Sequence, residues 1–414
     1  MRHDGTLCGI GNGKKWAVTA NVILALFFAQ FLTLSAPPAI AQTPSSSANA
    51  GWTTPEPTVQ ERLDAVEAMR GSRTQAGAPP GKQPPLPSKE PSKKPSKTPL
   101  MALILPGKTS AYGGAAQAVK TGFMAAAEAA QAKDSCLVIE HGNGEVVSAF
   151  QQATEAGVSV MVGPLVRDDL GVLLAMPPLA WTITLTQLED GETRLPSNLL
   201  PLTLTVESDA RFLAREIFIE GREGVPVIVS NETPLMRRFA DAFIDEWLRF
   251  GETVPERMRF STEEIATLKT RLEALSPSAV LLAVEGNDAA LARAQTKSWP
   301  TYASGHIYQR QEQFGAVALD GLQVVEIPWL VTPQAVRFKA LPPLPPSPAM
   351  ARLYALGYDA FQTAEAFLEG PPMAIAFEGA SGNIRYSRKE GLVRTGQLAV
   401  FEKGRLQPAE TLSP

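Results

Sequence analysis

From residue 100 onward, short apolar runs alternate with stretches in which apolar residues recur at helical spacing. The first set comprises predicted strands at 101–105, 136–140, 158–162 and 180–185 and predicted helices at 114–133, 145–156 and 167–175. Alternation at this spacing predicts right-handed βαβ units, and hence a parallel sheet with helices on both faces.

The same rhythm restarts after a less regular stretch at 188–206. The second set comprises helices at 207–220, 234–250, 262–275, 287–296 and 349–368, strands at 225–229, 257–260, 279–284, 301–304 and 322–327, and short strands with turns over 382–406. We therefore predict an α/β fold of two Rossmann-like lobes with parallel sheets joined by a hinge. The first lobe would span about 100–203 and 328–380, and the second about 204–327 and the C-terminal strands.

Ligands of open parallel sheets bind outside the carboxyl ends of the strands, so two such lobes predict a cleft between them. The candidate cleft residues are Ser110, Tyr112, Pro164, Arg167, Thr184, Gln187, Ser304 and His306. Arg167 would suit an anionic ligand because its guanidinium can pair with two oxygens. A solvated position at the start of a helix explains the same arginine without a ligand.

Residues 1–41 have the pattern of a secretory signal. Arg2, Lys14 and Lys15 precede an apolar stretch over 16–34, and Ala39-Ile40-Ala41 offers a small-x-small cleavage site. We expect export to the periplasm, with Gln42 as the new N-terminus. The apolar stretch also has the length of a membrane anchor, so tethering by an uncleaved signal is the alternative. No cysteine stands at the cleavage point to carry a lipid.

The segment 42–99 is rich in Pro, Ser and Lys, and such a composition cannot bury enough apolar surface to fold. We predict a disordered tether that is semi-rigid where proline is dense. Within it, 58–70 carries apolar residues at helical spacing. Those residues suit either a short amphipathic helix that docks on a partner or a nascent helix in a disordered tail.

Bulk composition narrows the class of function. The chain of 414 residues is 44% hydrophobic with a formal net charge of -4, and no block of basic residues interleaved with aromatics occurs from residue 100 onward. Nucleic acid is therefore not an expected partner. The only two cysteines are Cys8, in the predicted signal, and Cys136, which begins an apolar run. We expect no disulfide and a buried structural thiol at Cys136.

Catalytic and metal-binding patterns are sparse. Beyond the predicted signal the chain has two histidines, His141 and His306, and no Gly-x-Ser-x-Gly, His-Glu-x-x-His or paired-cysteine motif. Ser304 and His306 are close in sequence, but that spacing alone is common. We expect no catalytic residues, no metal and no cofactor, and the protein is not expected to be an enzyme.

Several segments resemble one known family. Leu103-Ile104-Leu105-Pro106 and a helix with Gly122-Phe123 resemble the start of type I periplasmic binding folds. More specific segments are Val162-Gly163-Pro164-Leu165, Tyr302-Ala303-Ser304, Asp320-Gly321-Leu322, Ile327-Pro328-Trp329-Leu330, the helix around Gly357-Tyr358-Asp359-Ala360, and Gly379-Ala380-Ser381-Gly382. Together they resemble the LppC/LpoA-type penicillin-binding protein activators over about 100–408.

The resemblance implies a periplasmic, non-enzymatic regulator that binds a bifunctional penicillin-binding protein and stimulates peptidoglycan cross-linking. Peptidoglycan itself is a further candidate partner. The better-known members of the family carry a helical-repeat domain before this one, and they have a lipid-bearing cysteine. In this sequence the predicted tether stands in place of that domain, and the lipid-bearing cysteine is not found. A solute-binding protein for a small amino-acid-like or anionic ligand is the alternative, although Leu165, Val166 and Arg167 stand where amino-acid receptors usually place hydroxyls.

Overall fold

The computed structural model describes residues 100–175, 178, 180–188, 195–308 and 316–410. The predicted signal peptide (1–41), the tether (42–99) and the short helix at 58–70 lie outside the described residues. None of the helices within the described ranges combines the length and the apolar character needed to cross a bilayer.

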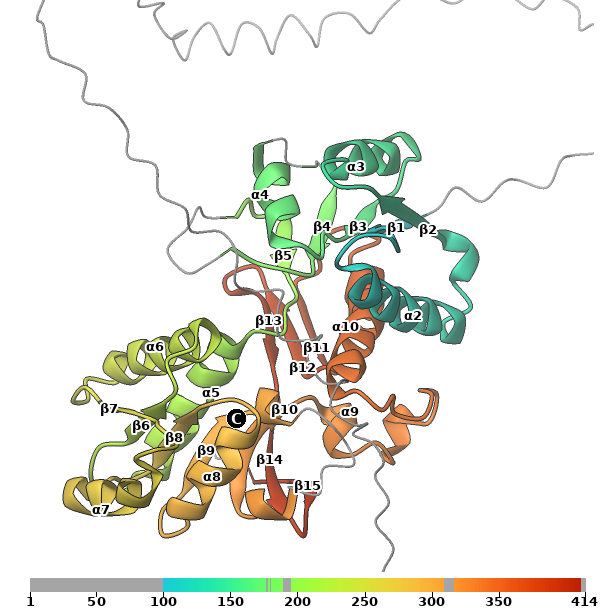
Figure 1. Cartoon of the computed structure of the whole chain (residues 1–414). Coiled ribbons are helices and arrows are strands. Elements are labelled where there is room, and N and C mark those ends of the chain that lie inside the picture. Colours follow the sequence, from blue (N-terminus) through green and yellow to red (C-terminus); the bar gives the residue numbers. More distant parts are fainter. Residues whose placement is uncertain (1–99, 176–177, 179, 189–194, 309–315, 411–414) are drawn as a thin grey trace, which may run out of the picture. The chain divides into compact units, whose positions relative to one another are not determined.

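A five-stranded parallel sheet in the order β2-β1-β3-β4-β5 forms the first lobe (Figure 1). Its strands are β1 (Met101–Pro106), β2 (Cys136–His141), β3 (Val160–Val162), β4 (Trp181–Thr184) and β5 (Leu199–Pro201), and its helices are α2 (Gly113–Ala129), α3 (Val146–Glu155) and α4 (Arg167–Ala175). All six residues of β1 are buried, which explains its continuous apolar sequence. The sequence pattern did not predict β5, because three residues are too few to show a period.

The helix α10 (Pro348–Glu365) returns from the far end of the chain to pack on α2 (Figure 1). The two backbones approach closely at a glycine on each helix. A Cβ atom at Gly122 would lie 1.9 Å from the Tyr354 carbonyl oxygen, and one at Gly357 would lie 2.0 Å from the Val119 carbonyl oxygen. Gly122 belongs to a segment that resembles type I periplasmic binding folds and Gly357 to one that resembles the activator family, so this part of the resemblance reflects helix packing.

The second lobe is built on a seven-stranded sheet in the order β15-β14-β10-β9-β8-β6-β7. Its strands are β6 (Val227–Ser230), β7 (Glu256–Arg259), β8 (Val280–Ala283), β9 (Thr301–Ser304), β10 (Leu322–Glu326), β14 (Gln397–Glu402) and β15 (Arg405–Pro408). Its helices are α5 (Val206–Glu220), α6 (Pro234–Arg249), α7 (Ile265–Leu275) and α8 (Asn287–Gln295). Strands β6 to β10 are parallel, whereas β14 and β15 run antiparallel at one edge.

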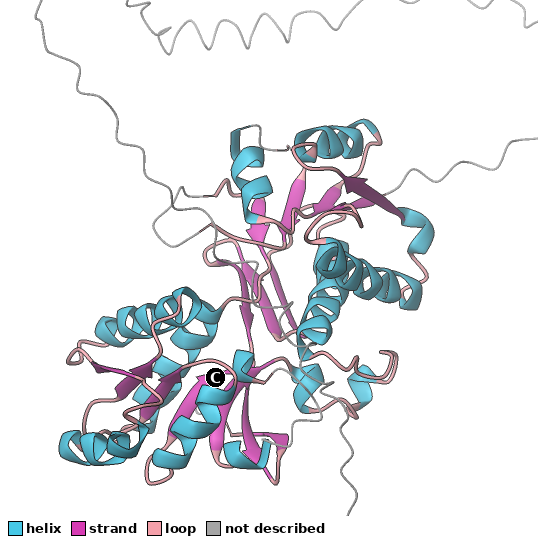
Figure 2. Cartoon of the chain, in the orientation of Figure 1, coloured by secondary structure: helices cyan, strands magenta, loops and turns pink. Residues whose placement is uncertain are grey.

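Helices cover both faces of this second sheet (Figure 2). Apolar residues of α5 and α6 form one core with the sheet, and those of α7 and α8 form another on the opposite face. Threonine caps help to start two of these helices, because the Thr205 hydroxyl accepts from the Ser208 amide and the Thr233 hydroxyl accepts from the Met236 amide. The predicted α/β fold with two Rossmann-like lobes is confirmed.

A third, antiparallel sheet consists of β11 (Ala374–Glu378), β12 (Asn383–Ser387) and β13 (Gly391–Thr395). The C-terminal strands were predicted to belong to the second lobe, but only β14 and β15 join its sheet. Ile384, Tyr386 and Leu392 point instead into the core of the first lobe. The alternation of buried and exposed residues along β12 and β13 shows that one face of this sheet packs and the other is open.

Short helical segments complete the fold. The helix α9 (Pro328–Val331) follows β10, and all four of its residues are buried. The 3-10 helices are η1 (Lys133–Ser135), η2 (Gly305–Ile307), η3 (Ala316–Leu319) and η4 (Val336–Phe338). Within α9, the Trp329 ring lies 5.1 Å from that of Tyr354 on α10, so the segment after β10 packs on the helix of the first lobe.

Candidate functional site

Six of the eight candidate cleft residues follow strands of the first lobe. They are Ser110 and Tyr112 after β1, Pro164 and Arg167 after β3, and Thr184 and Gln187 at and after the end of β4. Since parallel strands end at the same edge of a sheet, these residues share the carboxyl edge of the first lobe. Ligand binding by them stays a prediction.

The hydroxyl of Thr184 is already engaged within the protein. Thr184 is fully buried, and its Oγ1 donates a hydrogen bond of 2.9 Å to the Thr186 carbonyl. The side-chain oxygen of Gln187 accepts a 3.3 Å hydrogen bond from the Thr203 hydroxyl. Both side chains therefore fix the local loop after β4 in this conformation.

The other first-lobe candidates differ widely in exposure. The Tyr112 side chain is 51% exposed, and its backbone amide donates to the Ser110 hydroxyl at 3.2 Å. Pro164 is buried, and its carbonyl accepts a hydrogen bond from the Leu185 amide. Tyr112 is thus available to a ligand from solvent, while Pro164 shapes the loop.

In the second lobe, Ser304 and His306 lie at the end of β9 and in η2. The Ser304 side chain is 1% exposed, and its hydroxyl lies 3.0 Å from Nδ1 of His306 and 3.4 Å from Oδ2 of Asp209. A hydrolytic triad needs the carboxylate to orient the histidine. Here the carboxylate contacts the serine instead, so the arrangement does not match that of a nucleophilic serine.

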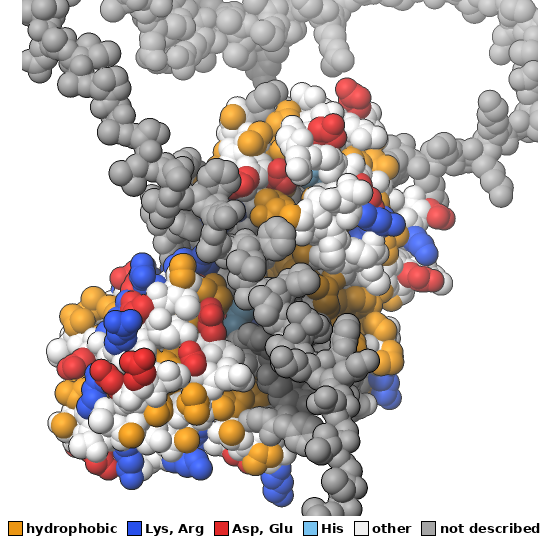
Figure 3. Space-filling view, viewed as in Figure 1, with side chains coloured by type: hydrophobic (Ala, Val, Ile, Leu, Met, Phe, Trp, Pro, Cys, Tyr) orange, Lys and Arg blue, Asp and Glu red, His pale blue; other side chains and the backbone are white. Residues whose placement is uncertain are grey.

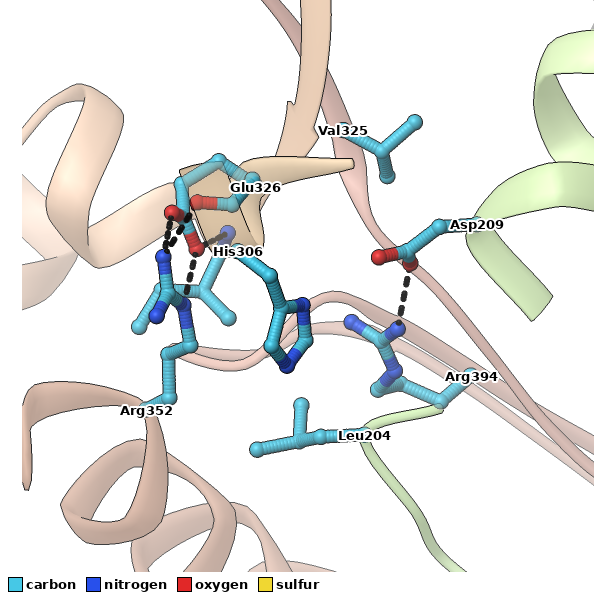
Figure 4. Close-up of a pocket in the computed structure, with 9 residues that line it drawn as sticks. Leu204, Asp209, His306, Val325, Glu326, Arg352 and Arg394 are labelled. Atoms are coloured by element: carbon cyan, nitrogen blue, oxygen red, sulfur yellow. Dashed lines mark hydrogen bonds and ion pairs between the residues drawn. The ribbon is translucent and has the colours of Figure 1, made fainter. Parts of the chain in front are cut away.

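Two buried ion pairs lie on either side of His306 (Figure 4). Arg352 of α10 holds the Glu326 carboxylate with two nitrogens, of which Nε lies 2.9 Å from Oε1. The same guanidinium donates to the Gly305 carbonyl at 2.7 Å and to the Tyr308 carbonyl. One arginine from the helix of the first lobe is therefore bonded to two segments of the second lobe, the end of β10 and η2 with the residue after it.

The second ion pair joins Asp209 of α5 to Arg394 of β13 at 3.2 Å. Arg394 also donates to the Ser381 carbonyl at 2.8 Å. The amide and the hydroxyl of Ser381 in turn donate to the fully buried Asp359, as does the Ala380 amide. A chain of polar contacts thus runs from α5 through the third sheet to α10.

These groups line a small cavity that we call the junction cavity. Its walls are Leu204, Asp209, Gly305, His306, Val325, Glu326, Ile327, Arg352 and Arg394 (Figure 4). The cavity measures about 20 Å³. That volume accommodates about one water molecule, so in this conformation the cavity excludes an amino acid.

Burial controls protonation around the junction cavity. It raises the pKa of Asp209 to about 7, although Arg394 acts in the opposite direction. Burial also lowers the pKa of His306 to about 4, and the Arg352 charge adds to this effect. His306 is therefore neutral near pH 7, with one ring nitrogen available as an acceptor.

Of the residues that line this cavity, the sequence offered only His306, as a candidate of the cleft between the lobes, and it did not point to the four charged residues Asp209, Glu326, Arg352 and Arg394. Glu326 offered a signal, because it interrupts the apolar run Val324-Val325-x-Ile327 at a strand end. The others lie on elements separated along the chain, so only the fold brings them together.

The outer surface of the second lobe carries both signs of charge. On the face in Figure 3, Lys/Arg and Asp/Glu side chains alternate over this lobe. A representative network is Glu232, whose carboxylate pairs with two nitrogens of Arg257, which also contacts Asp241 at 2.7 Å. Among the described residues, no group of three or more His, Cys, Asp or Glu side chains could hold a metal ion.

Sequence comparison finds relatives in one family. The family model described as "LppC putative lipoprotein" matches residues 93–272. A curated relative, penicillin-binding protein activator LpoA of Klebsiella pneumoniae subsp. pneumoniae, is 26% identical over 300 residues, covering 62% of this chain and 42% of the relative. The chain thus spans less than half the length of that relative.

Structure comparison finds the same fold in two further proteins. The LpoA (YraM) C-domain from Haemophilus influenzae, a regulator of PBP1A, matches with a TM-score of 0.63 at 19% identity, over 75% of this chain and 99% of that one. A Chromobacterium violaceum structure described as "a putative branched-chain amino acid ABC transporter" matches with a TM-score of 0.63 at 28% identity, over 72% of this chain and 99% of that one. The resemblance to the LppC/LpoA type and the type I periplasmic binding fold are confirmed.

Proposed function

We propose that this protein, which is similar to the LppC/LpoA type, is a non-catalytic regulator that binds and activates a peptidoglycan-synthesising penicillin-binding protein. The observation that carries the proposal is the similarity over 300 residues to an LpoA activator. The fold of an LpoA C-domain supports it, because nearly all of that domain is matched.

The geometry of the described residues is consistent with a regulator. Ser304, His306 and Asp209 do not form a hydrolytic triad, and the charges at the junction cavity are paired with one another. Activity would then come from a protein surface. The partner we propose is a bifunctional penicillin-binding protein, with peptidoglycan as a further contact, and the proposed location is the periplasm.

The direct test adds the purified protein to each bifunctional penicillin-binding protein of the same organism and measures peptidoglycan cross-linking. A dose-dependent rise is expected. An amino-acid receptor of the same fold, added at equal concentration, is the matched control and should have no effect. If the protein neither binds nor stimulates any such partner, this proposal is wrong.

A second candidate function is solute binding between the lobes. It is favoured by the 28% identity to the Chromobacterium violaceum structure, whose description names branched-chain amino acids. Titration calorimetry with L-leucine and L-valine tests it. Saturable binding of one molecule per chain, weakened by Ser110→Ala, would support a receptor, and the absence of heat with both amino acids would reject it.

A further inference from the structure

A much larger concavity lies on the open face of the third sheet. It measures about 880 Å³ and is bounded by α5, by the α9–η4 region and by the strands β11, β12 and β13. We call it the sheet groove. Its volume is near the upper end of the range for ligand pockets, and it is more than large enough for several side chains.

The groove has an apolar part. Phe212 and Ile219 of α5 and Ala376 of β11 line this part, whereas Phe377 of β11 packs against the core of the first lobe. Ile219 is 46% exposed, and Ala376 is exposed as well. β11, which contributes to this part of the groove, is an edge strand, because it pairs only with β12 within the described residues. Burial of these side chains by a partner would be favourable.

Three arginines line the groove, and two of them are paired with carboxylates of the same chain. The side chains of Arg215 and Arg337 are 47% and 40% exposed, and they pair with Glu246 and with Glu378 respectively. The side chain of Arg385 on β12 is exposed and has no hydrogen bond or ion pair among the described residues. The groove therefore presents one unpaired positive charge, at Arg385.

The groove also offers a hydrogen-bond acceptor. The side-chain oxygen of Gln397, at the start of β14, is buried and has no hydrogen-bond partner within the part of the chain that is described. A buried acceptor gains free energy when a donor reaches it. A peptide backbone supplies N–H donors of this kind, and acidic side chains supply carboxylates that match the planar guanidinium.

From these features we propose that the sheet groove binds an acidic, partly apolar peptide segment of the partner protein. One of its carboxylates pairs with Arg385, its apolar side chains contact Ile219 and Ala376, and one of its amides donates to Gln397. The identity of the partner as a penicillin-binding protein rests on the proposed function. The proposal that the groove binds an acidic, partly apolar peptide does not depend on that function.

The test compares Arg385→Glu with Arg388→Glu. Arg388 is exposed in the turn after β12, three residues from Arg385, and it does not line the groove, so both variants make the same charge change on the same hairpin. Circular dichroism and thermal melting check that each is folded. Ala376→Trp is a second, uncharged variant that fills the groove.

The first measurement uses a fluorescent ten-residue peptide of alternating valine and glutamate, with alternating valine and lysine as the reversed-charge control. The wild type is expected to prefer the acidic peptide, and added salt should weaken the binding. Arg385→Glu should reduce affinity about tenfold. Ala376→Trp should also reduce it, and Arg388→Glu should stay within about twofold of wild type.

The second measurement repeats binding and stimulation of the bifunctional penicillin-binding protein with the same variants. A loss with Arg385→Glu but not Arg388→Glu supports the groove as the contact surface. If wild type stimulates and Arg385→Glu does so equally, the groove inference is overturned while the activator proposal stands. If wild type stimulates no such partner but binds the acidic peptide through Arg385, the activator proposal fails and the peptide site stands. If wild type and all variants bind both peptides equally, the groove inference is also overturned.

Discussion

Arginines line both concavities of this protein, the junction cavity and the sheet groove, but their surroundings differ. Around the junction cavity of about 20 Å³, Arg352 and Arg394 are buried and bonded to carboxylates. Around the groove of about 880 Å³, the arginines are partly or fully exposed, and Arg385 has no partner among the described residues. The buried arginines join parts of one chain, whereas exposed and unpaired arginine can bind another molecule.

Burial is the physical reason for this division. A charge that leaves water without a partner is costly, so a buried arginine must be paired within the fold. An exposed arginine keeps its water until a carboxylate replaces it, and its free energy of pairing is then available for binding. Substitutions at the junction should therefore change stability, and substitutions in the groove should change binding.

The largest expected effect is on stability at the junction. Arg352→Ala leaves the carboxylate of Glu326, a residue only 3% exposed, without its partner. We expect the free energy of unfolding to fall by about 3–5 kcal/mol. Urea unfolding followed by circular dichroism measures it.

A surface pair provides the matched control for Arg352. Arg271 of α7 is 39% exposed and lies 3.3 Å from Glu264, so Arg271→Ala should cost less than about 1 kcal/mol. The double variant Glu326→Leu/Arg352→Met removes both buried charges and should recover most of the loss. If Arg352→Ala and Arg271→Ala lower the free energy of unfolding equally, the distinction between buried and surface ion pairs is wrong.

The next effect depends on pH and involves Asp209. Burial raises the folded-state pKa of Asp209 to about 7, above its value of about 3.9 in an unfolded chain. The neutral form is thus favoured by folding, and its stabilising contribution is complete below about pH 4 and is lost as the pH rises to about 7. The stability of wild type relative to Asp209→Asn should fall over this window by at most about 1.4 kcal/mol per pH unit.

Unfolding of both proteins at a series of pH values tests this sign. The exposed Asp245 on α6 provides the control variant Asp245→Asn, which removes a carboxylate outside the junction. A constant difference between wild type and Asp209→Asn would mean that Arg394 keeps the carboxylate ionised throughout.

How far a feature depends on local sequence explains what the sequence could predict. Local period and composition identified the alternating strands and helices, because each element such as β1 carries its own apolar signal. They did not identify β5 or β11, of which the first is short and the second is half exposed. The partial burial of β11 is also what leaves the groove open.

Site residues were harder to predict than elements. The carboxyl ends of strands pointed to His306 because a parallel sheet places functional residues there. The pairing of Glu326 with Arg352 and of Asp209 with Arg394 depends on how three sheets meet, and no local spacing records it. Arg385 is one of many exposed arginines in the sequence, and only the shape of the groove distinguishes it.

The smallest predicted effect concerns Ser304, which lies at the junction and is also a candidate cleft residue. Ser304→Ala removes a hydroxyl that contacts His306 and Asp209, and it should lower the free energy of unfolding by about 1 kcal/mol. If the protein is an activator that uses the groove, stimulation of the penicillin-binding protein should be unchanged. If it is a solute receptor, the affinity for L-leucine should fall. Calorimetry and the cross-linking assay on this one variant therefore show which of the two concavities supports function. A loss of stimulation in a stable, folded Ser304→Ala protein would mean that the junction, and not the groove, supports activation.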